Sequence, residues 1–182
     1  MLELSLHILD IVENSTRAGA KSVQIDIIED KRRDLLTIEI RDDGSGMSED
    51  VLSKAMDPFF TTKTVRHVGL GLPMLAQAAE QTGGRLVVES KGGEGTSVVA
   101  EFKLSHIDRQ PLGNIVSTLV TLVAGNTDVD FIYRHRRDDR EYLLDTGSIR
   151  KEIGDLPMNH VKVLIFIKEH VQGGLQDIGT EA

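Results

Sequence analysis

The feature that most constrains the fold is a stretch near the start of the chain, residues 6–20 (LHILDIVENSTRAGA), in which apolar residues surround a narrow polar strip. Its Leu, Ile and Val residues would cover most of the circumference of a helix, which predicts a helix packed against a sheet. Asp10 and Asn14 lie four residues apart and therefore share one face. Carboxylate and amide oxygens suit a hydrated Mg²⁺ ion with phosphate, and the alternative is that both side chains are solvated surface groups.

Two stretches that alternate apolar and polar residues follow this helix. Residues 22–29 and 36–41 have the period of two that is typical of half-buried strands, and the polar residues between them predict a hairpin turn. A short helix after Ser48, a helix from about Pro73, and two strands joined by a glycine-rich turn are predicted next. Residues 1–104 should therefore form an α/β (α+β) two-layer sandwich, in which a mixed, largely antiparallel sheet carries helices on one face.

The pattern changes at Ser105, and residues 105–182 are expected to form a small α+β C-terminal extension. The sequence predicts a helix over 111–124, a hairpin with strands at 129–135 and 141–144, and a short helix over 148–156. The basic run RHRR within 134–137 is interpreted as the charged tip of this hairpin.

Residues 160–171 fit either a buried strand or a helix. Their length and the pair Gly173 and Gly174 favour a helix that ends at these glycines. The extension could cover a sheet edge, form a homodimer or bind a partner, and the sequence does not rank these roles.

Bulk properties exclude several classes of function. The net charge of −8 argues against a nucleic-acid-coating role, because phosphate backbones require clustered Lys and Arg. The chain has no cysteine, which rules out disulfides and thiolate metal sites. No apolar run approaches 18 residues and no signal peptide precedes Leu2, so we expect a soluble, cytoplasmic protein without nucleic-acid or membrane partners.

Several glycine clusters carry the functional signal, although each alone is weak and neither the P-loop nor the dinucleotide fingerprint is complete. After Asn14 come DxGxG at 42–46, PFFTTK at 58–63, GLGL at 69–72 and GxGT at 93–96. In order and spacing this set resembles the Bergerat-fold (GHKL) ATPases, which include sensor histidine kinases, anti-sigma-factor kinases, type II topoisomerases, heat-shock chaperones and mismatch-repair proteins. The resemblance covers residues 1–104, and it is closest to small stand-alone bacterial histidine-kinase-like ATP-binding proteins.

The resemblance implies a site for ATP and Mg²⁺. By this resemblance Asn14 supplies the protein ligand to Mg²⁺, and Asp42 accepts a hydrogen bond from the adenine amino group. Gly69 and Gly71 would offer backbone N–H groups to the phosphates, and Lys63 would reach the γ-phosphate from a lid loop over 61–68. The expected nucleotide-binding residues are Asn14, Asp42, Gly44, Gly46, Met47, Lys63, Gly69, Leu70, Gly71, Leu72 and Thr96.

Asp10 is the candidate catalytic residue. Family members that hydrolyse ATP or phosphorylate serine carry a glutamate four residues before the asparagine, and typical histidine kinases carry an asparagine there. Asp10 keeps a carboxylate that can accept a proton, although its side chain is one methylene shorter. Glu13 is the rival base, but an ion pair with Arg17 is the expected role for it. We expect His7 to orient or pack rather than to accept phosphate.

The resemblance leaves three functions open. The first is an ATP:protein phosphotransferase, histidine- or serine-kinase-like, that acts in trans on a partner protein. The second is a slow ATPase that acts as a nucleotide-driven conformational switch. The third is a non-catalytic adenine-nucleotide sensor.

Overall fold

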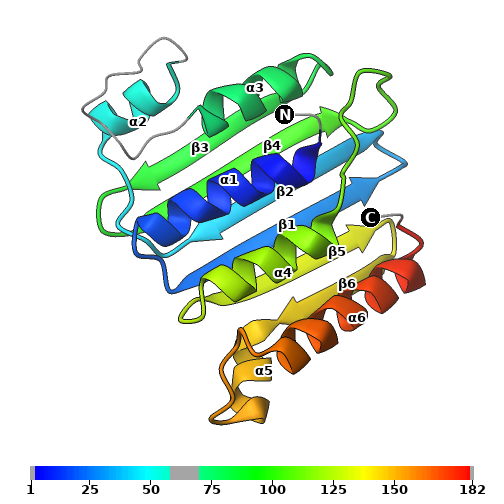
Figure 1. Ribbon diagram of the computed structural model, residues 1–182. Helices are drawn as coiled ribbons and strands as arrows, with labels where there is room; N and C mark the ends of the chain where they lie inside the picture. The colour runs from blue at the N-terminus through cyan, green and yellow to red at the C-terminus, as the bar shows by residue number, and fades with distance from the viewer. Residues whose placement is uncertain (1–2, 58–69, 181–182) are drawn as a thin grey trace.

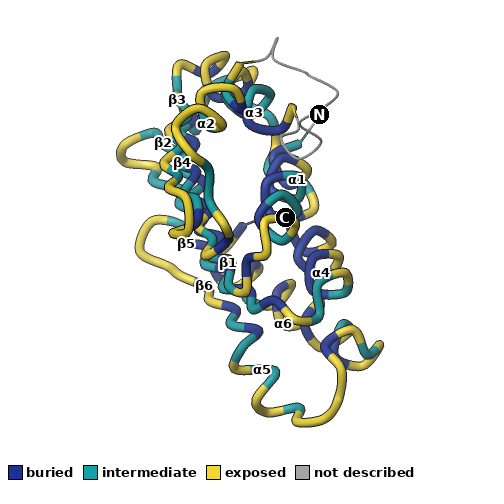
Figure 2. The backbone as a smooth tube through the Cα atoms, turned by 90° about the vertical axis from the view of Figure 1, so that its left-hand side faces the viewer, coloured by how far each residue is buried: buried dark blue, intermediate teal, exposed yellow. Residues whose placement is uncertain are grey.

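The computed structural model describes residues 3–57 and 70–180, in which six strands form one sheet in the order β3-β4-β2-β1-β5-β6 (Figure 1). The helices α1, α3, α4 and α6 all cover the same face of this sheet (Figure 2). The strands are β1 (Ser22–Asp30), β2 (Leu35–Asp42), β3 (Arg85–Lys91), β4 (Gly95–Lys103), β5 (Asp130–Arg137) and β6 (Arg140–Asp145). The helices are α1 (Leu4–Arg17), α2 (Glu49–Ala55), α3 (Gly71–Glu80), α4 (Ile115–Gly125), α5 (Thr146–Ile153) and α6 (Val161–Ile178). The predicted two-layer architecture is confirmed.

The core lies between α1 and the centre of the sheet. Alternate residues of β1 and β2 face the helices and are almost fully buried, including Ile25, Ile27 and Ile38. The apolar residues of α1 that face them, such as Ile8 and Val12, are equally buried. Burial of each such side chain contributes about 1.5–3 kcal/mol. This packing fixes α1 on the sheet and sets the direction in which its polar strip points.

Residues 105–180 continue the same sheet. β5 pairs with β1 in parallel, whereas the other four strand pairings are antiparallel, which gives the mixed, largely antiparallel sheet that the sequence predicts. The extension also binds the start of α1. The backbone N–H of Leu4 donates to the carbonyl of Pro111 at 2.9 Å, and that of Ser5 donates to Leu112 at 2.8 Å. These bonds satisfy two of the N–H groups that a helix start leaves free.

The helix predicted from residue 111 begins later, at Ile115. The preceding residues cannot be helical because the carbonyls of Pro111 and Leu112 turn towards α1 and Gly113 has a φ of +78°. Asn114 instead caps the helix, and its side chain accepts a hydrogen bond from the backbone N–H of Ser117 at 2.9 Å.

The ambiguous segment near the C-terminus is a helix, as favoured, but it does not end at the glycine pair. α6 continues through Gly173 and Gly174 to Ile178, and Gly179 in a left-handed conformation terminates it. A Cβ atom on Gly174 would lie 2.0 Å from Cδ2 of Tyr142, so the glycine allows α6 to pack closely on β6. Tertiary packing therefore overrides the tendency of glycine to stop a helix.

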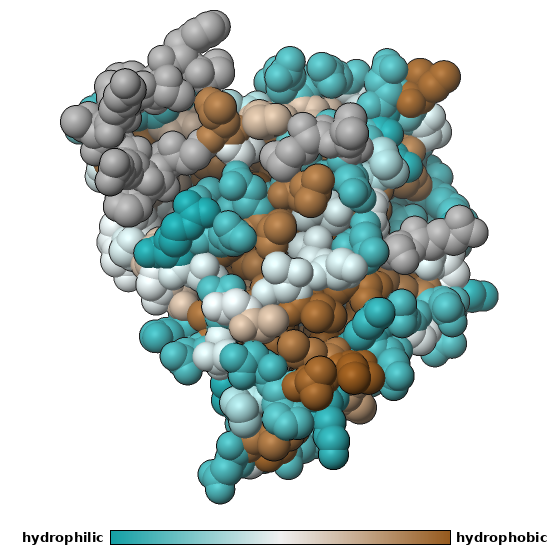
Figure 3. Space-filling view, viewed as in Figure 1, coloured by the Kyte–Doolittle hydropathy of each residue, from teal (hydrophilic) through white to brown (hydrophobic). Residues whose placement is uncertain are grey.

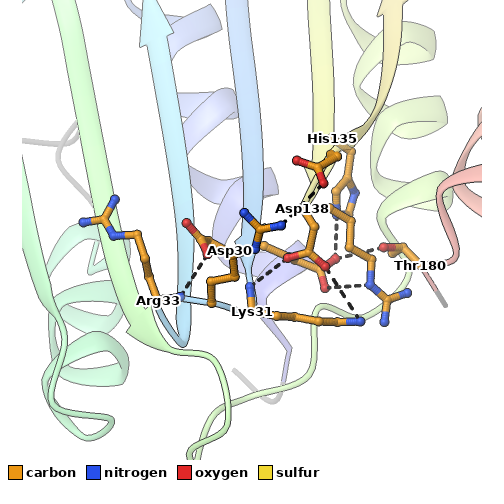
Figure 4. Close-up of polar contacts among 10 residues, drawn as sticks. Asp30, Lys31, Arg33, His135, Asp138 and Thr180 are labelled. Atoms are coloured by element: carbon orange, nitrogen blue, oxygen red, sulfur yellow. Dashed lines mark hydrogen bonds and ion pairs between the residues drawn. The ribbon is translucent and has the colours of Figure 1, made fainter.

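The basic run over 134–137 lies within β5, so the prediction of a charged hairpin tip is wrong. Nε of Arg134 lies 2.8 Å from Oδ1 of Asp26 on β1, and His135 is fully buried. The tip is formed by acidic residues instead, and the N–H of Lys31 donates to Oδ1 of Asp138 at 2.9 Å, which joins the two hairpin turns (Figure 4). Two of the arginines, Arg134 and Arg137, pair with the carboxylates of Asp26 and Glu29 on the adjacent β1, which favours their place on the strand.

In the part of the chain that the structure describes, no helix combines the length and the apolar character needed to cross a membrane.

Candidate functional site

A cavity of about 340 Å³ lies beside α1, where β2 and β4 reach the edge of the core. This volume is within the range of small-molecule binding sites. Most of the wall is apolar, and a few polar groups converge on it, which is the usual composition of such sites. The lining residues are Ile11, Asn14, Ser15, Arg17, Ala18, Asp42, Ser45, Gly46, Met47, Val51, Leu72, Thr96 and Val98.

The carboxylate of Asp42 is held in a fixed orientation at the end of β2. The hydroxyl of Ser15 donates to its Oδ2 at 2.6 Å, and the backbone N–H of Gly44 donates to its Oδ1 at 2.9 Å. Each carboxylate oxygen can accept more than one hydrogen bond, so Asp42 retains capacity towards a ligand in the cavity. Thr96 is its register partner on β4.

Glycines allow the end of β2 to approach the β3–β4 turn. Gly46 has a φ of +62°, and a Cβ atom there would lie 2.0 Å from the carbonyl oxygen of Lys91. The N–H of Met47 donates to Oγ of Ser90 at 2.8 Å, and the same hydroxyl lies 2.8 Å from Oγ1 of Thr96. This chain of contacts positions both Met47 and Thr96 on the cavity wall.

Asn14 lines the cavity and carries an oxygen that no described residue satisfies. Its Oδ1 is buried and has no hydrogen-bond partner among the described residues. A buried acceptor without a partner costs about 1–3 kcal/mol, so a ligand that pairs with it is favoured. An amide oxygen fits Mg²⁺, which needs few protein ligands when phosphate and water supply the rest. Residues 3–57 and 70–180 contain no cluster of three or more His, Cys, Asp or Glu that could hold a metal alone.

Asp10 lies one helical turn before Asn14 and contacts the start of α3. A Cβ atom on Gly71 would lie 1.9 Å from Oδ2 of Asp10, so only glycine permits this approach. The start of a helix carries partial positive charge from its free N–H groups, and this charge attracts a carboxylate or a phosphate. Leu70 immediately precedes the helix and is half exposed, and Leu72 is buried and lines the cavity.

The structure therefore separates the predicted residues into three groups. Asn14, Asp42, Gly46, Met47, Leu72 and Thr96 line the cavity, and Gly44 adjoins it through its bond to Asp42. Leu70 and Gly71 lie at the start of α3, and Asp10 of α1 contacts Gly71 there. Lys63, Gly69 and the expected lid over 61–68 fall outside the described residues.

Two other residues of α1 have the roles expected for them. Glu13 forms an ion pair with Arg17, with 3.1 Å between Oε2 and Nη2. His7 is buried, with its Nε2 3.1 Å from Oε1 of Gln110, and burial lowers its pKa below the ordinary value. Ser15 and Ser90 were not predicted, because hydroxyl groups that orient other side chains belong to no glycine motif.

Known proteins provide an independent comparison. The family model described as histidine kinase-, DNA gyrase B-, and HSP90-like ATPase matches residues 2–106. The sensor kinase CckA of Brucella abortus (strain 2308) is 45% identical over 65 residues, which are 35% of this chain and 7% of that protein. Sporulation kinase E of Bacillus subtilis (strain 168) is 42% identical over 64 residues, which are 35% of this chain and 8% of that protein. The match thus spans only a small part of these two kinases.

A solved structure shares the fold. The crystal structure of the N-terminal domain of a DNA repair protein superposes with a TM-score of 0.55 and 15% sequence identity, over 80% of this chain and 53% of that one. The family model covers more than half of the chain, and the cavity lies within the matched residues. The chain belongs to the histidine kinase-, DNA gyrase B-, and HSP90-like ATPase family, and this membership implies ATP binding.

Proposed function

We propose that the chain is a Mg²⁺-dependent ATP-binding protein that transfers the γ-phosphoryl group of ATP to a partner protein in trans, in the ATP-supplied cytoplasm. The observation that carries this proposal is Oδ1 of Asn14, which is buried and has no hydrogen-bond partner among the described residues, on a side chain that lines the same cavity as Asp42. An unpaired acceptor at this position is costly in the free protein and becomes favourable when a cation binds.

Selectivity for adenine is assigned to Asp42. Its carboxylate is fixed by Ser15 and Gly44, and it would accept a hydrogen bond from the amino group of adenine. Guanine presents a carbonyl at the equivalent position, which would leave two acceptors facing each other without a proton. The apolar wall around Met47 and Val98 would contact the faces of the base.

Phosphate binding and proton transfer are assigned to the region between α1 and α3. Mg²⁺, when bound at Asn14, would neutralise charge on the phosphates. The free N–H groups at the start of α3 would donate to phosphate oxygens. The carboxylate of Asp10, which lies against Gly71, would take the proton of the attacking hydroxyl, imidazole or water.

Incubation with γ-labelled ATP and candidate proteins from the same cells tests this function. Transfer of label to a second protein supports the phosphotransferase. Release of labelled phosphate alone indicates a slow ATPase, and tight binding without either product indicates a non-catalytic adenine-nucleotide sensor. A matched reaction with the Asn14→Ala variant controls for contaminating kinases.

The slow ATPase that switches a partner is the second candidate, and one observation favours it. α1 lines the cavity with Asn14, while its first turn is bonded to the extension through Leu4 and Ser5. A nucleotide-dependent shift of α1 would therefore reach residues 111–125. Hydrogen exchange in α4, measured with and without Mg²⁺ and ATP, should change under this mechanism and stay constant if α1 does not move.

A further inference from the structure

The outward side of α6 exposes two adjacent large apolar side chains to solvent. The helix packs on α4 and β6 and buries Val163, Ile167, Val171, Leu175 and Ile178. On the opposite side, the side chains of Ile165 and Phe166 are 50% and 51% exposed. Lys162 and Glu169 are exposed one turn before and one turn after them, within the same arc of roughly 100°. Apolar surface is visible where α6 crosses the lower half of the molecule (Figure 3).

The exposed ring of Phe166 is already held in place. Its centroid lies 5.7 Å from that of His170, which in turn lies 5.5 Å from the ring of Tyr142. The hydroxyl of Tyr142 and Nδ1 of His170 are 2.6 Å apart, within hydrogen-bonding distance. Because this stack orders Phe166 in the free chain, association would lose little side-chain entropy at this position.

Gly173 on the same side of α6 has no structural explanation within the described chain. A Cβ atom at this position would have nothing within 4 Å, unlike one at Gly174, which would collide with Tyr142. A glycine inside a helix costs about 1 kcal/mol relative to alanine. This glycine leaves the exposed face of α6 without a side chain near the C-terminal end of the helix.

We propose that this α6 surface, comprising Lys162, Ile165, Phe166 and Glu169, binds the same surface of a second copy of the chain, with the two helices antiparallel. A two-fold axis between Ile165 and Phe166 sets Ile165 against the partner's Phe166. The same axis sets Lys162 against the partner's Glu169, and the reverse pair follows by symmetry.

Charge complementarity selects a second copy as the occupant. Within residues 3–57 and 70–180, neither Lys162 nor Glu169 takes part in an ion pair, although each is exposed. Lys162 and Glu169 carry opposite charges and lie at equal distances on either side of the apolar pair. A two-fold rotation therefore places each of them beside the opposite charge of the second copy. A nucleic acid, or another partner of one charge sign, would be repelled by half of this surface.

Sedimentation of the full chain over a concentration series tests the proposal and requires no nucleotide turnover. The wild-type chain should form a dimer, and Ile165→Lys should raise its dissociation constant by about tenfold or more, since a charge would enter the apolar centre. Ile107→Lys is the matched control, because Ile107 is 94% exposed and lies outside the α6 surface. This variant should dimerise like the wild type.

A charge exchange gives a second measurement that loss of folding cannot mimic. Lys162→Glu and Glu169→Lys should each weaken the dimer by about threefold or more, because each change places two like-charged pairs across the axis. The double variant should recover the wild-type dissociation constant. A monomeric wild-type chain, a dimer indifferent to Ile165→Lys, or a double variant no stronger than the single ones would overturn the proposal.

Discussion

At the scale of single residues, several polar groups around the cavity are satisfied by the protein itself, whereas Asn14 keeps an oxygen that no described residue satisfies. Ser15 and Gly44 hold Asp42, and Ser90 holds Thr96. Oδ1 of Asn14 has no such partner among the described residues. The proposed nucleotide site is therefore preorganised around one acceptor that no described residue pairs with.

Asn14→Ala should separate ligand binding from stability. Mg²⁺-dependent ATP binding should weaken by about tenfold or more, because the metal loses its protein ligand. The free energy of unfolding should stay constant or rise, since a buried unpaired acceptor is replaced by a better helix former. Calorimetric titration and urea unfolding measure both quantities. Asn159→Ala, at an exposed residue, is the control, and unimpaired ATP binding by Asn14→Ala would refute the metal assignment.

Asp10→Asn should stop turnover while leaving ATP affinity within a few-fold of the wild type. The amide keeps the size of the side chain beside Gly71 but cannot accept a proton, and loss of a general base costs about 10²–10⁴ in rate. Glu13→Gln is the matched control, because Glu13 pairs with Arg17 on the surface. If single-turnover rates of Asp10→Asn equal those of the wild type, the base is a different group.

Glu29 should make stability depend on pH below its ordinary pKa of 4.5. Burial alone would raise its pKa, but hydrogen bonds from His135 at 2.8 Å and Thr180 at 2.9 Å, together with the charge of Arg137, lower it. A lowered pKa in the folded state stabilises the protein above pH 4.5, and this stabilisation is lost as the pH falls further. Urea unfolding over a pH series should show that the free energy of unfolding of the wild type falls below pH 4.5. The fall should be smaller in Glu29→Gln. The control Glu89→Gln, at an exposed residue, should show the same fall as the wild type.

At the scale of secondary structure elements, local patterns predict most of the fold and non-local contacts explain the errors. α1 and the β1–β2 hairpin follow from apolar periodicity over a few residues. The start of α4 and the end of α6 were mispredicted, because bonds to α1 and packing against Tyr142 decide them. Local and non-local information differ in the same way at the cavity. Asp42 belongs to a local sequence motif and lines the cavity, whereas the role of Ser15 depends on a hydrogen bond to a residue 27 positions away.

The two adjacent glycines of α6 should respond oppositely to alanine. Gly174→Ala should lower the free energy of unfolding by about 1–3 kcal/mol, because the new methyl group would overlap the ring of Tyr142. Gly173→Ala has open space and should raise it by up to about 1 kcal/mol at protein concentrations where the chain is monomeric. Urea unfolding of the two variants measures both effects, and equal changes would contradict the packing described for α6.

At the scale of the whole molecule, the sheet joins the matched domain to the extension. β5 pairs with β1 along eight residues, from Ser22 opposite Asp130 to Glu29 opposite Arg137. The cavity lies wholly within the first 104 residues, whereas the start of α1 is bonded to residues 111 and 112. These connections favour one cooperative unit over independently folding parts.

Thermal unfolding can test this cooperativity with intrinsic probes. The two tyrosines of the chain, Tyr133 and Tyr142, both lie in the extension, and the chain has no tryptophan. Tyrosine fluorescence therefore reports on residues 105–182, and far-ultraviolet circular dichroism reports on all elements. The two transitions should coincide, and Mg²⁺ with ATP should raise both midpoints equally by mass action. Separate midpoints, or a shift in the dichroism alone, would indicate two independent domains.

The parallel pairing of β1 with β5 also sets an order of events during synthesis. A distance of 108 positions separates Ser22 from Asp130, and at typical ribosomal rates this length takes about 5–20 s to translate. For that interval, one side of β1 in the nascent chain has no neighbour, and unpaired strand edges are sites of aggregation. The nascent chain is therefore most exposed to aggregation before β5 leaves the ribosome, and least once β5 has docked on β1.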